Sequence, residues 1–217
     1  MPAVTLNAPW LSLDLGAELR VLSWALNRPG YVRARRILWR EVRNADLPPD
    51  LDVRAWLAAE LDALGAADAV VLLTSRDVTS HRSAAVPGAF CLATVGLSNA
   101  ERVGHRLPRD PSRWGTINLA LQLDAPLSDT GLLEALSIAT EARTAAVMDL
   151  GLRLPVGIAT GTGTDCIAVA APEGGQDYAG LHTDTGEAIG AAVYAAVTAG
   201  GQDWMRDVAP RFTPPPA

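Results

Sequence analysis

The chain has 217 residues, of which 18 are basic and 24 acidic, so its formal net charge at pH 7 is −6. Every basic residue is arginine, which excludes chemistry that needs a lysine: a Schiff base, a phosphate-binding P-loop or a Ser–Lys pair. The acidic balance argues against a protein that binds nucleic acid or an anionic membrane through clustered positive charge. With 49% hydrophobic and 19% charged residues, the composition is typical of a globular protein.

A chain of this length buries enough surface to fold without a disulfide or a metal. We therefore expect one domain over residues 1–217, with its core at about 15–200 and a loose tail over 208–217. No predicted linker divides the sequence, and no internal repeat is visible.

The first part of the chain carries strand patterns. Alternating apolar residues predict strands over 4–6, 10–14 and 18–24, followed by a turn at 27–30 that contains Pro29 and Gly30. The next stretch, 31–42, is rich in arginine and fits either an exposed strand or a short helix.

Helices and strands then follow one another without regular alternation. Asp52 can cap a helix over 53–64 that ends at Gly65, and Ser128 or Asp129 can open a long helix that ends before Gly151. The remaining expected elements are strands over 69–74, 89–97, 116–123, 156–160 and 166–171, and a last helix over 185–199 that Gly200 and Gly201 close. This order predicts an α/β protein of the α+β type, in which mixed β-sheet layers are covered by about three helices.

Three polar segments interrupt the apolar runs at predicted strand ends, where a ligand could be bound. They are 94–100, which contains Ser98 and Asn99; 114–118, which contains Asn118; and 159–165, which reads Ala-Thr-Gly-Thr-Gly-Thr-Asp. Glycines allow close approach of a ligand to the backbone, and the side chains and free amides can donate and accept hydrogen bonds. The same residues also build ordinary turns, so both interpretations stay open for each segment.

The long helix and the segment before the last helix add titratable groups. The long helix has few charges, so we expect Glu141 to be buried, either at a site or in a pair with an arginine such as Arg143. His182 stands just before the last helix, where it could serve as general acid or base. His81 and His105 are interpreted as surface residues, and Cys91 and Cys166 as buried, reduced thiols.

Seven segments, taken in order, resemble the adenosylcobinamide amidohydrolase family. They are Arg20-Val21-Leu22-Ser23, residues 95–100, Gly115-Thr116-Ile117-Asn118, Ala125-Pro126-Leu127-Ser128, Thr140-Glu141-Ala142-Arg143-Thr144, residues 159–165, and Ala179-Gly180-Leu181-His182-Thr183. The family pattern has paired glycines where this chain has Arg28-Pro29-Gly30, an asparagine near Trp39 that is missing here, and a lysine where Arg143 stands.

The resemblance implies a bacterial enzyme of corrinoid salvage. Its expected reaction is hydrolysis of the amide that joins aminopropanol to adenosylcobinamide, giving adenosylcobyric acid, with related cobamides as further substrates. The alternatives are a non-catalytic corrinoid-binding or regulatory protein and an amidohydrolase of another amide.

Amide hydrolysis needs a nucleophile, an oxyanion site and a proton for the leaving amine. We expect His182, Asp165 and Glu141 to supply the acid and base. The expected substrate-binding residues are Ser98, Asn99, Asn118, Thr160, Gly161, Thr162, Gly163 and Thr164. Either water or a hydroxyl of Ser98, Thr162 or Thr164 would attack.

No metal-ligand spacing is visible, so we expect no metal and no cofactor, the corrinoid being the substrate. No signal-peptide or membrane-span pattern is present, which indicates a cytoplasmic protein without membrane or nucleic-acid partners. The last helix, which has no charge over 188–199, is expected in the core rather than at an interface, and assembly into a homo-oligomer stays open.

Overall fold

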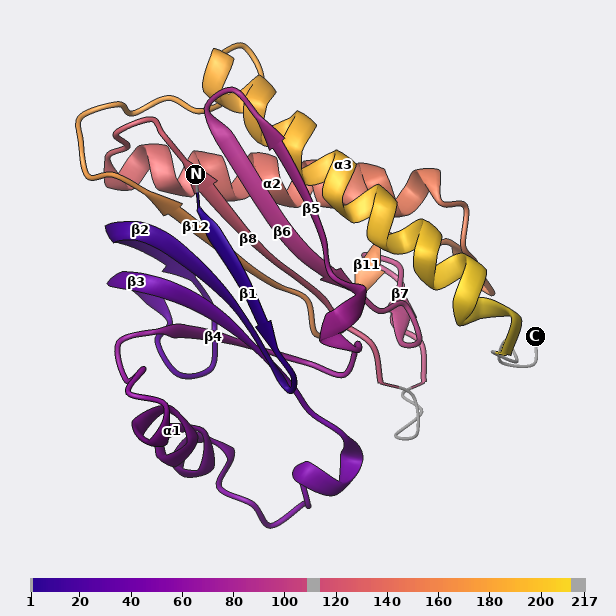
Figure 1. Cartoon of the computed structure of the whole chain (residues 1–217). Coiled ribbons are helices and arrows are strands. Elements are labelled where there is room, and N and C mark those ends of the chain that lie inside the picture. Colours follow the sequence, from indigo (N-terminus) through magenta and orange to yellow (C-terminus); the bar gives the residue numbers. More distant parts are fainter. Residues whose placement is uncertain (1, 109–113, 212–217) are drawn as a thin grey trace.

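The computed structural model of the chain describes residues 2–108 and 114–211. A mixed eight-stranded sheet dominates the fold (Figure 1), with strand order β4-β3-β2-β12-β8-β6-β5 and with β1 paired to β2. Its strands are β1 (Ala3–Asn7), β2 (Trp10–Ser23), β3 (Gly30–Glu41), β4 (Val70–Thr74), β5 (Arg82–Val86), β6 (Ala89–Val95), β8 (Ile117–Leu123) and β12 (Cys166–Ala171). Two small two-stranded sheets stand apart: β7 (Ala100–Glu101) with β11 (Gly161–Thr162), and β9 (Arg153–Leu154) with β10 (Gly157–Ile158).

The large sheet is strongly curled. β4 and β8 are separated by three strands in the sheet order, yet Asn118 Nδ2 on β8 donates to the carbonyl oxygen of Leu73 on β4 at 2.6 Å. The Thr74 and Thr94 hydroxyls of β4 and β6 lie 3.5 Å apart, also across the curl. The inner face of the sheet encloses a core of its own, which includes Leu13, Trp39, Leu72, Leu92 and Ala168.

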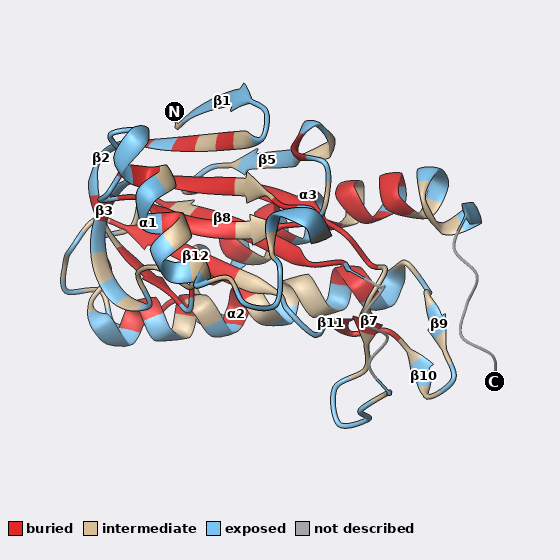
Figure 2. Cartoon of the chain, turned by 90° about the horizontal axis from the view of Figure 1, so that it is seen from below, coloured by how far each residue is buried: buried red, intermediate tan, exposed pale blue. Residues whose placement is uncertain are grey.

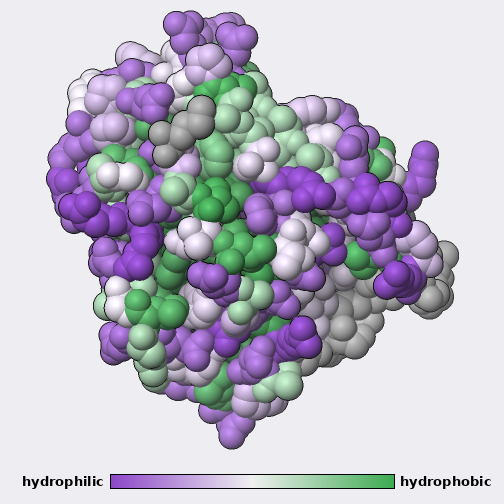
Figure 3. All heavy atoms as spheres, in the orientation of Figure 1, coloured by the Kyte–Doolittle hydropathy of each residue, from purple (hydrophilic) through white to green (hydrophobic). Residues whose placement is uncertain are grey.

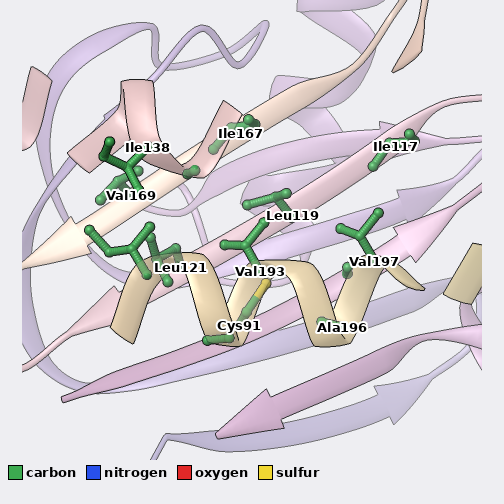
Figure 4. Close-up of a cluster of buried hydrophobic side chains, with 14 of the residues drawn as sticks. Cys91, Ile117, Leu119, Leu121, Ile138, Ile167, Val169, Val193, Ala196 and Val197 are labelled. Atoms are coloured by element: carbon green, nitrogen blue, oxygen red, sulfur yellow. The ribbon is translucent and has the colours of Figure 1, made fainter. Parts of the chain in front are cut away.

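Helices cover the outside of the curled sheet. α2 (Asp129–Asp149) and α3 (Asp184–Asp207) pack together on the side of β6, β8 and β12, while α1 (Val53–Ala63) covers β3 and β4 (Figure 1). The buried residues concentrate on the strands and on the inward sides of α2 and α3 (Figure 2). Side chains such as Leu119, Leu121, Val193 and Val197 fill the layer between sheet and helices (Figure 4). Three short 3-10 helices complete the described chain: Asn44–Asp46, Val78–Ser80 and Ala209–Arg211.

Most of the expected elements are confirmed, including the α+β class. The ambiguous stretch 31–42 is strand β3, and Asp52 and Ser128 cap α1 and α2 through hydrogen bonds to backbone amides. The expected strands 10–14 and 18–24 are one bent strand, because a register shift between Asp14 and Leu19 keeps both halves paired to β3. The sequence prediction missed β5, and the expected strand 156–160 is only the short β10.

The chain ends differ from the expectation of a core at 15–200. β1 is part of the sheet, and α3 continues to Asp207 with Trp204 buried. Within the expected loose tail over 208–217, residues 209–211 form a 3-10 helix, and 212–217 lie outside the described residues.

The predicted end of the last helix at Gly200 and Gly201 is wrong. α3 continues through both glycines, and their lack of a side chain permits close packing with neighbouring elements. A Cβ on Gly201 would overlap Leu150 Cδ1, and one on Gly200 would lie 2.8 Å from Val95 Cγ2.

We predict opposite effects for two Gly-to-Ala substitutions on α3. Gly201→Ala should lower the free energy of unfolding by about 1–3 kcal/mol, because the added methyl group overpacks the contact with Leu150. Gly190→Ala, where an added Cβ meets nothing within 4 Å, should raise it by up to about 1 kcal/mol through helix propensity. Urea unfolding of both variants tests this, and equal shifts of the same sign would contradict it.

Candidate functional site

A cavity of about 500 Å³ opens where β4 meets β8 at one end of the curled sheet. Its wall comes from the chain after β2 and β3, the end of β4, and the segments that precede β8 and β12. The lining residues are Trp24, Ala25, Leu26, Val42, Leu47, Val71, Leu72, Leu73, Ser75, Trp114, Gly115, Thr116, Asn118, Gly163, Thr164, Asp165 and Cys166.

Asp165 is the acidic residue of this wall, and its side chain is 6% exposed. Its Oδ1 accepts hydrogen bonds from the Ile117 amide at 2.9 Å and from Thr162 Oγ1 at 2.5 Å. Its Oδ2 accepts from the Thr162 amide at 3.0 Å and lies 3.0 Å from Arg143 Nη1. One carboxylate thus joins the start of β8, helix α2 and the 159–165 loop.

Arg143 reaches this carboxylate from the middle of α2. It also donates from Nη1 to the Thr160 carbonyl oxygen at 2.8 Å. Gly161 makes the approach possible, since a Cβ there would overlap Arg143 Nη1 and lie 2.7 Å from Asp165 Oδ2. Burial raises the pKa of the Asp165 carboxyl above its usual range, and the positive charge of Arg143 and the hydrogen bonds from Thr162 and Ile117 oppose this rise.

The 94–100 and 159–165 segments are joined by hydrogen bonds. β7 pairs with β11, the Thr160 amide donates to the Glu101 carbonyl oxygen at 2.9 Å, and Thr160 Oγ1 accepts from the Val103 amide at 2.8 Å. Asn99 Nδ2 lies 3.5 Å from Thr164 Oγ1, and Thr164 Oγ1 donates to the Gly115 carbonyl oxygen at 3.0 Å. The third polar segment, 114–118, is therefore part of the same cluster.

Asn118 acts mainly as a structural cross-link. Its Nδ2 donates to Leu73 across the curl, and its Oδ1 accepts from Thr116 Oγ1 at 3.2 Å. The side chain is 1% exposed, and the residue lines the cavity. Replacing the amide by an apolar group would leave the Leu73 carbonyl without this donor, so the shape of the cavity depends on Asn118.

Several hydrogen-bonding groups of the cavity wall have no partner among the described residues. They include the hydroxyl of Ser75, directly after β4, and the backbone amide of Gly163. By contrast, the side chains of Thr116, Asn118, Thr164 and Asp165 are all engaged within the chain. Ser75 and Gly163 can therefore meet a ligand without breaking an existing hydrogen bond.

Both cysteines are free, but only one is buried. Cys91 lies in the core between sheet and helices, and burial raises the pKa of its thiol far above the usual range. Cys166 is half-buried on the cavity wall, and burial raises the pKa of its thiol to about 12. A thiol with that pKa stays protonated at neutral pH and is a poor nucleophile.

The structure brings the predicted binding segments together but separates the predicted catalytic residues. Asp165 precedes β12, whereas His182 follows it and is exposed beside the start of α3, at the opposite end of that strand. Glu141 was expected to be buried, and this expectation is wrong: it lies on the outward side of α2, while Arg143 points inward. The helix is apolar because α2 buries residues on its other side, including Leu132, Ala135 and Ala139. Catalytic roles for His182 and Glu141 stay predictions.

Sequence reasoning missed several residues of the cavity. Trp24 and Ser75 line it, as does Trp114, which enters the prediction only as the first residue of the 114–118 segment. Arg143, expected only as a partner of Glu141, contacts Asp165. An available signal was Trp24 and Trp114, two tryptophans that border predicted strands beside polar segments. Ser75 gave no signal, because a serine after a strand is ordinary turn chemistry.

Residues 3–209 match the model of the adenosylcobinamide amidohydrolase family. The chain belongs to this family. An adenosylcobinamide amidohydrolase from Halobacterium salinarum is 32% identical over 169 residues, which cover 71% of this chain and 68% of that protein. An uncharacterized protein from Methanocaldococcus jannaschii is 44% identical over 87 residues, which cover 38% of this chain and 34% of that protein. The match thus spans about a third of the length of the Methanocaldococcus protein.

Within residues 2–108 and 114–211, no helix is long and apolar enough to cross a membrane. Over the same ranges, His, Cys, Asp and Glu side chains form no group of three or more that could hold a metal ion.

The ion pair between Arg143 and Asp165 predicts a pH-dependent stability. The folded-state pKa of the Asp165 carboxyl is raised above the unfolded value of about 3.9. Its contribution to the free energy of unfolding is therefore fully present below about pH 3.9, and it is lost as the pH rises through the folded-state pKa. Arg143→Leu removes the opposing charge and raises this pKa further. We therefore expect its loss in free energy of unfolding to be larger at pH 8 than at pH 5, by at most about 1.4 kcal/mol per additional pKa unit.

Urea unfolding at both pH values measures this effect. Arg102→Leu is the matched control, because Arg102 Nη1 donates to the Ile158 carbonyl oxygen at 2.8 Å and has no carboxylate among its described partners. Its loss should be independent of pH. An equally flat loss for Arg143→Leu would contradict the role assigned to the ion pair.

Proposed function

We propose that this chain hydrolyses the amide between aminopropanol and the corrin-ring propionate of adenosylcobinamide. One water is consumed, the C–N bond breaks, and the products are adenosylcobyric acid and free aminopropanol. The observation that carries the proposal is that the polar segments 114–118 and 159–165 meet at one cavity around Asp165, with the 94–100 segment hydrogen-bonded to the 159–165 segment, in a chain that belongs to this family over residues 3–209.

The character of the cavity supports an uncharged amide as ligand. Asp165 is the charged residue among those lining it, and Arg143 lies 3.0 Å from its carboxylate. The rest of the wall is apolar or carries hydroxyl, amide and backbone groups. A neutral amide finds apolar contacts and hydrogen-bonding partners there. A free acid would have to bury its charge beside the Asp165 carboxylate, and an ammonium group would compete with Arg143 for that carboxylate.

The residues of the wall suggest how the reaction proceeds. Asp165 accepts the proton: Thr162 Oγ1 already donates to it at 2.5 Å, and Arg143 holds the carboxylate in place. Proton transfer along this contact would either activate the Thr162 hydroxyl or relay a proton from an attacking water. If the hydroxyl attacks, an acyl ester forms on Thr162 as the amine leaves, and water then hydrolyses this ester, which releases the acid and restores the hydroxyl. The Gly163 amide and the Ser75 hydroxyl are donors available to the developing oxyanion, and the proton held at Asp165 then goes to the leaving amine.

The first experiment incubates the full chain with adenosylcobinamide and detects adenosylcobyric acid and aminopropanol by mass spectrometry. Asp165→Asn should lower kcat by about 10²–10⁴-fold, as for loss of a general base. The control is Asp62→Asn, which changes an exposed carboxylate on α1 that has no described partner and should leave kcat unchanged. Far-UV circular dichroism and urea unfolding show whether each variant is folded.

Three outcomes bear on the proposal. Product from the wild-type chain together with a folded but inactive Asp165→Asn variant supports it. Tight corrinoid binding without product favours the non-catalytic binding protein. Turnover of other amides without corrinoid binding favours an amidohydrolase of a different substrate.

Substitutions at Thr162 distinguish the two possible nucleophiles. If its hydroxyl attacks, Thr162→Ser keeps turnover, Thr162→Val abolishes it, and rapid quenching reveals wild-type protein with the added mass of the corrinoid acyl group. If water attacks, no such adduct forms. His182→Asn and Glu141→Gln, assayed in parallel, test the two remaining predicted catalytic residues: losses as large as that of Asp165→Asn would assign them to the reaction.

A further inference from the structure

The tryptophans of this chain fall into different environments. Trp39 and Trp204 are buried, and Trp10 and Trp56 are half-buried with their rings 5.5 and 5.3 Å from the Arg40 guanidinium carbon. Trp24 and Trp114 are 47% and 40% exposed, and both line the cavity. Indole rings are among the largest aromatic side chains, and burying their apolar surface is strongly favourable. A ligand that covers Trp24 and Trp114 would gain this free energy on binding.

Both exposed rings are attached to the segments that build the site. Trp24 Nε1 donates to the Asp165 carbonyl oxygen at 2.8 Å, so its indole is held beside the candidate catalytic carboxylate. Trp114 precedes Gly115, whose carbonyl oxygen accepts from Thr164 Oγ1. An added Cβ on Gly115 would lie 2.7 Å from the Ser98 amide, which shows how closely this segment is packed against the 94–100 segment. Figure 3 shows hydrophobic side chains gathered in the middle of one face of the molecule, bordered by hydrophilic ones.

The size of the cavity determines which part of the substrate can enter it. About 500 Å³ corresponds to roughly sixteen water molecules at about 30 Å³ each. That space suits the propionate–aminopropanol arm but not a corrin macrocycle with all its amide side chains. While the arm is inside, the planar, conjugated ring has to stay at the cavity wall, where the two indoles are exposed.

We propose that Trp24 and Trp114 bind the corrin macrocycle by ring contact and so determine that the enzyme acts on a corrinoid amide rather than on the isolated arm. This inference rests on the proposed function, because it places the scissile arm in the cavity. The indoles recognise the flat ring system, and the polar segments around Asp165 recognise the amide.

The test compares two substrates and a bound ligand. The substrates are adenosylcobinamide and N-(2-hydroxypropyl)propanamide, which is the arm without the ring. Equilibrium dialysis with dicyanocobinamide, which has both the ring and the same amide arm, measures binding of the whole corrinoid, and mass spectrometry of the dialysed ligand verifies that it stays uncleaved. Trp24→Ala and Trp114→Ala should each raise KM for adenosylcobinamide and Kd for dicyanocobinamide about tenfold, as for loss of a stacking contact. Their kcat/KM for adenosylcobinamide should fall by a larger factor than kcat/KM for the arm compound, which has no ring to contact.

Conservative variants and a control separate ring contact from other effects. Trp24→Phe keeps an aromatic ring but loses the hydrogen bond to Asp165, so it should retain corrinoid binding if the ring is what matters. Trp114→Phe should behave likewise. Trp56→Ala, on α1 and not among the residues lining the cavity, should leave both constants unchanged.

The outcomes distinguish this inference from the proposed function. Loss of dicyanocobinamide binding in folded alanine variants supports the inference even if the wild-type chain shows no hydrolysis, in which case only the proposed reaction fails. Wild-type turnover with unchanged KM and Kd in the alanine variants overturns the inference and leaves the reaction intact. A wild-type chain that neither binds dicyanocobinamide nor cleaves adenosylcobinamide overturns both.

Discussion

The Asp165 carboxylate receives hydrogen bonds from the first residue of β8 and from its own loop, and Arg143 of α2 pairs with it. Because it is almost fully buried, these partners have to stay in place: an isolated buried carboxylate would be strongly unfavourable. The loop, the strand and the helix are thus fixed relative to one another by the same group. The positions of Gly163 and Thr164 on the cavity wall follow from that arrangement, as does the need for glycine at position 161.

Local patterns predicted most of the secondary structure, because caps and apolar periodicity act within a few residues. Asp52, Ser128 and the alternating residues of β6 and β8 are examples. Periodicity failed where a residue serves a distant contact. Gly200 and Gly201 look like a helix end, but they accommodate Val95 and Leu150, and nothing near them in sequence reveals these neighbours.

In the candidate site, too, the features set by local sequence were predicted and those set by distant contacts were not. The three polar segments were identified because polar groups at strand ends have to be satisfied or used, and the structure joins them through β7, β11 and the Thr164 hydroxyl. Glu141 and Arg143 are two residues apart, so they point to different sides of α2, and only Arg143 reaches the site. The curl that brings Leu73 to Asn118 could not be predicted, since it depends on how the whole sheet closes over its inner core.

The direction of the two parallel strands has an electrostatic consequence. β8 and β12 run parallel, and the cavity lies at the end where both begin, whereas α2 and α3 start beyond the end where both finish. The positive ends of these two helix dipoles therefore lie far from the cavity, and they are already occupied by the caps Ser128 and Thr183. A phosphate group, which many α/β folds hold at a helix N-terminus, gains no such stabilisation here. The dipoles of α2 and α3 thus attract no anion to the cavity, and ligand binding there depends on the groups of the wall itself.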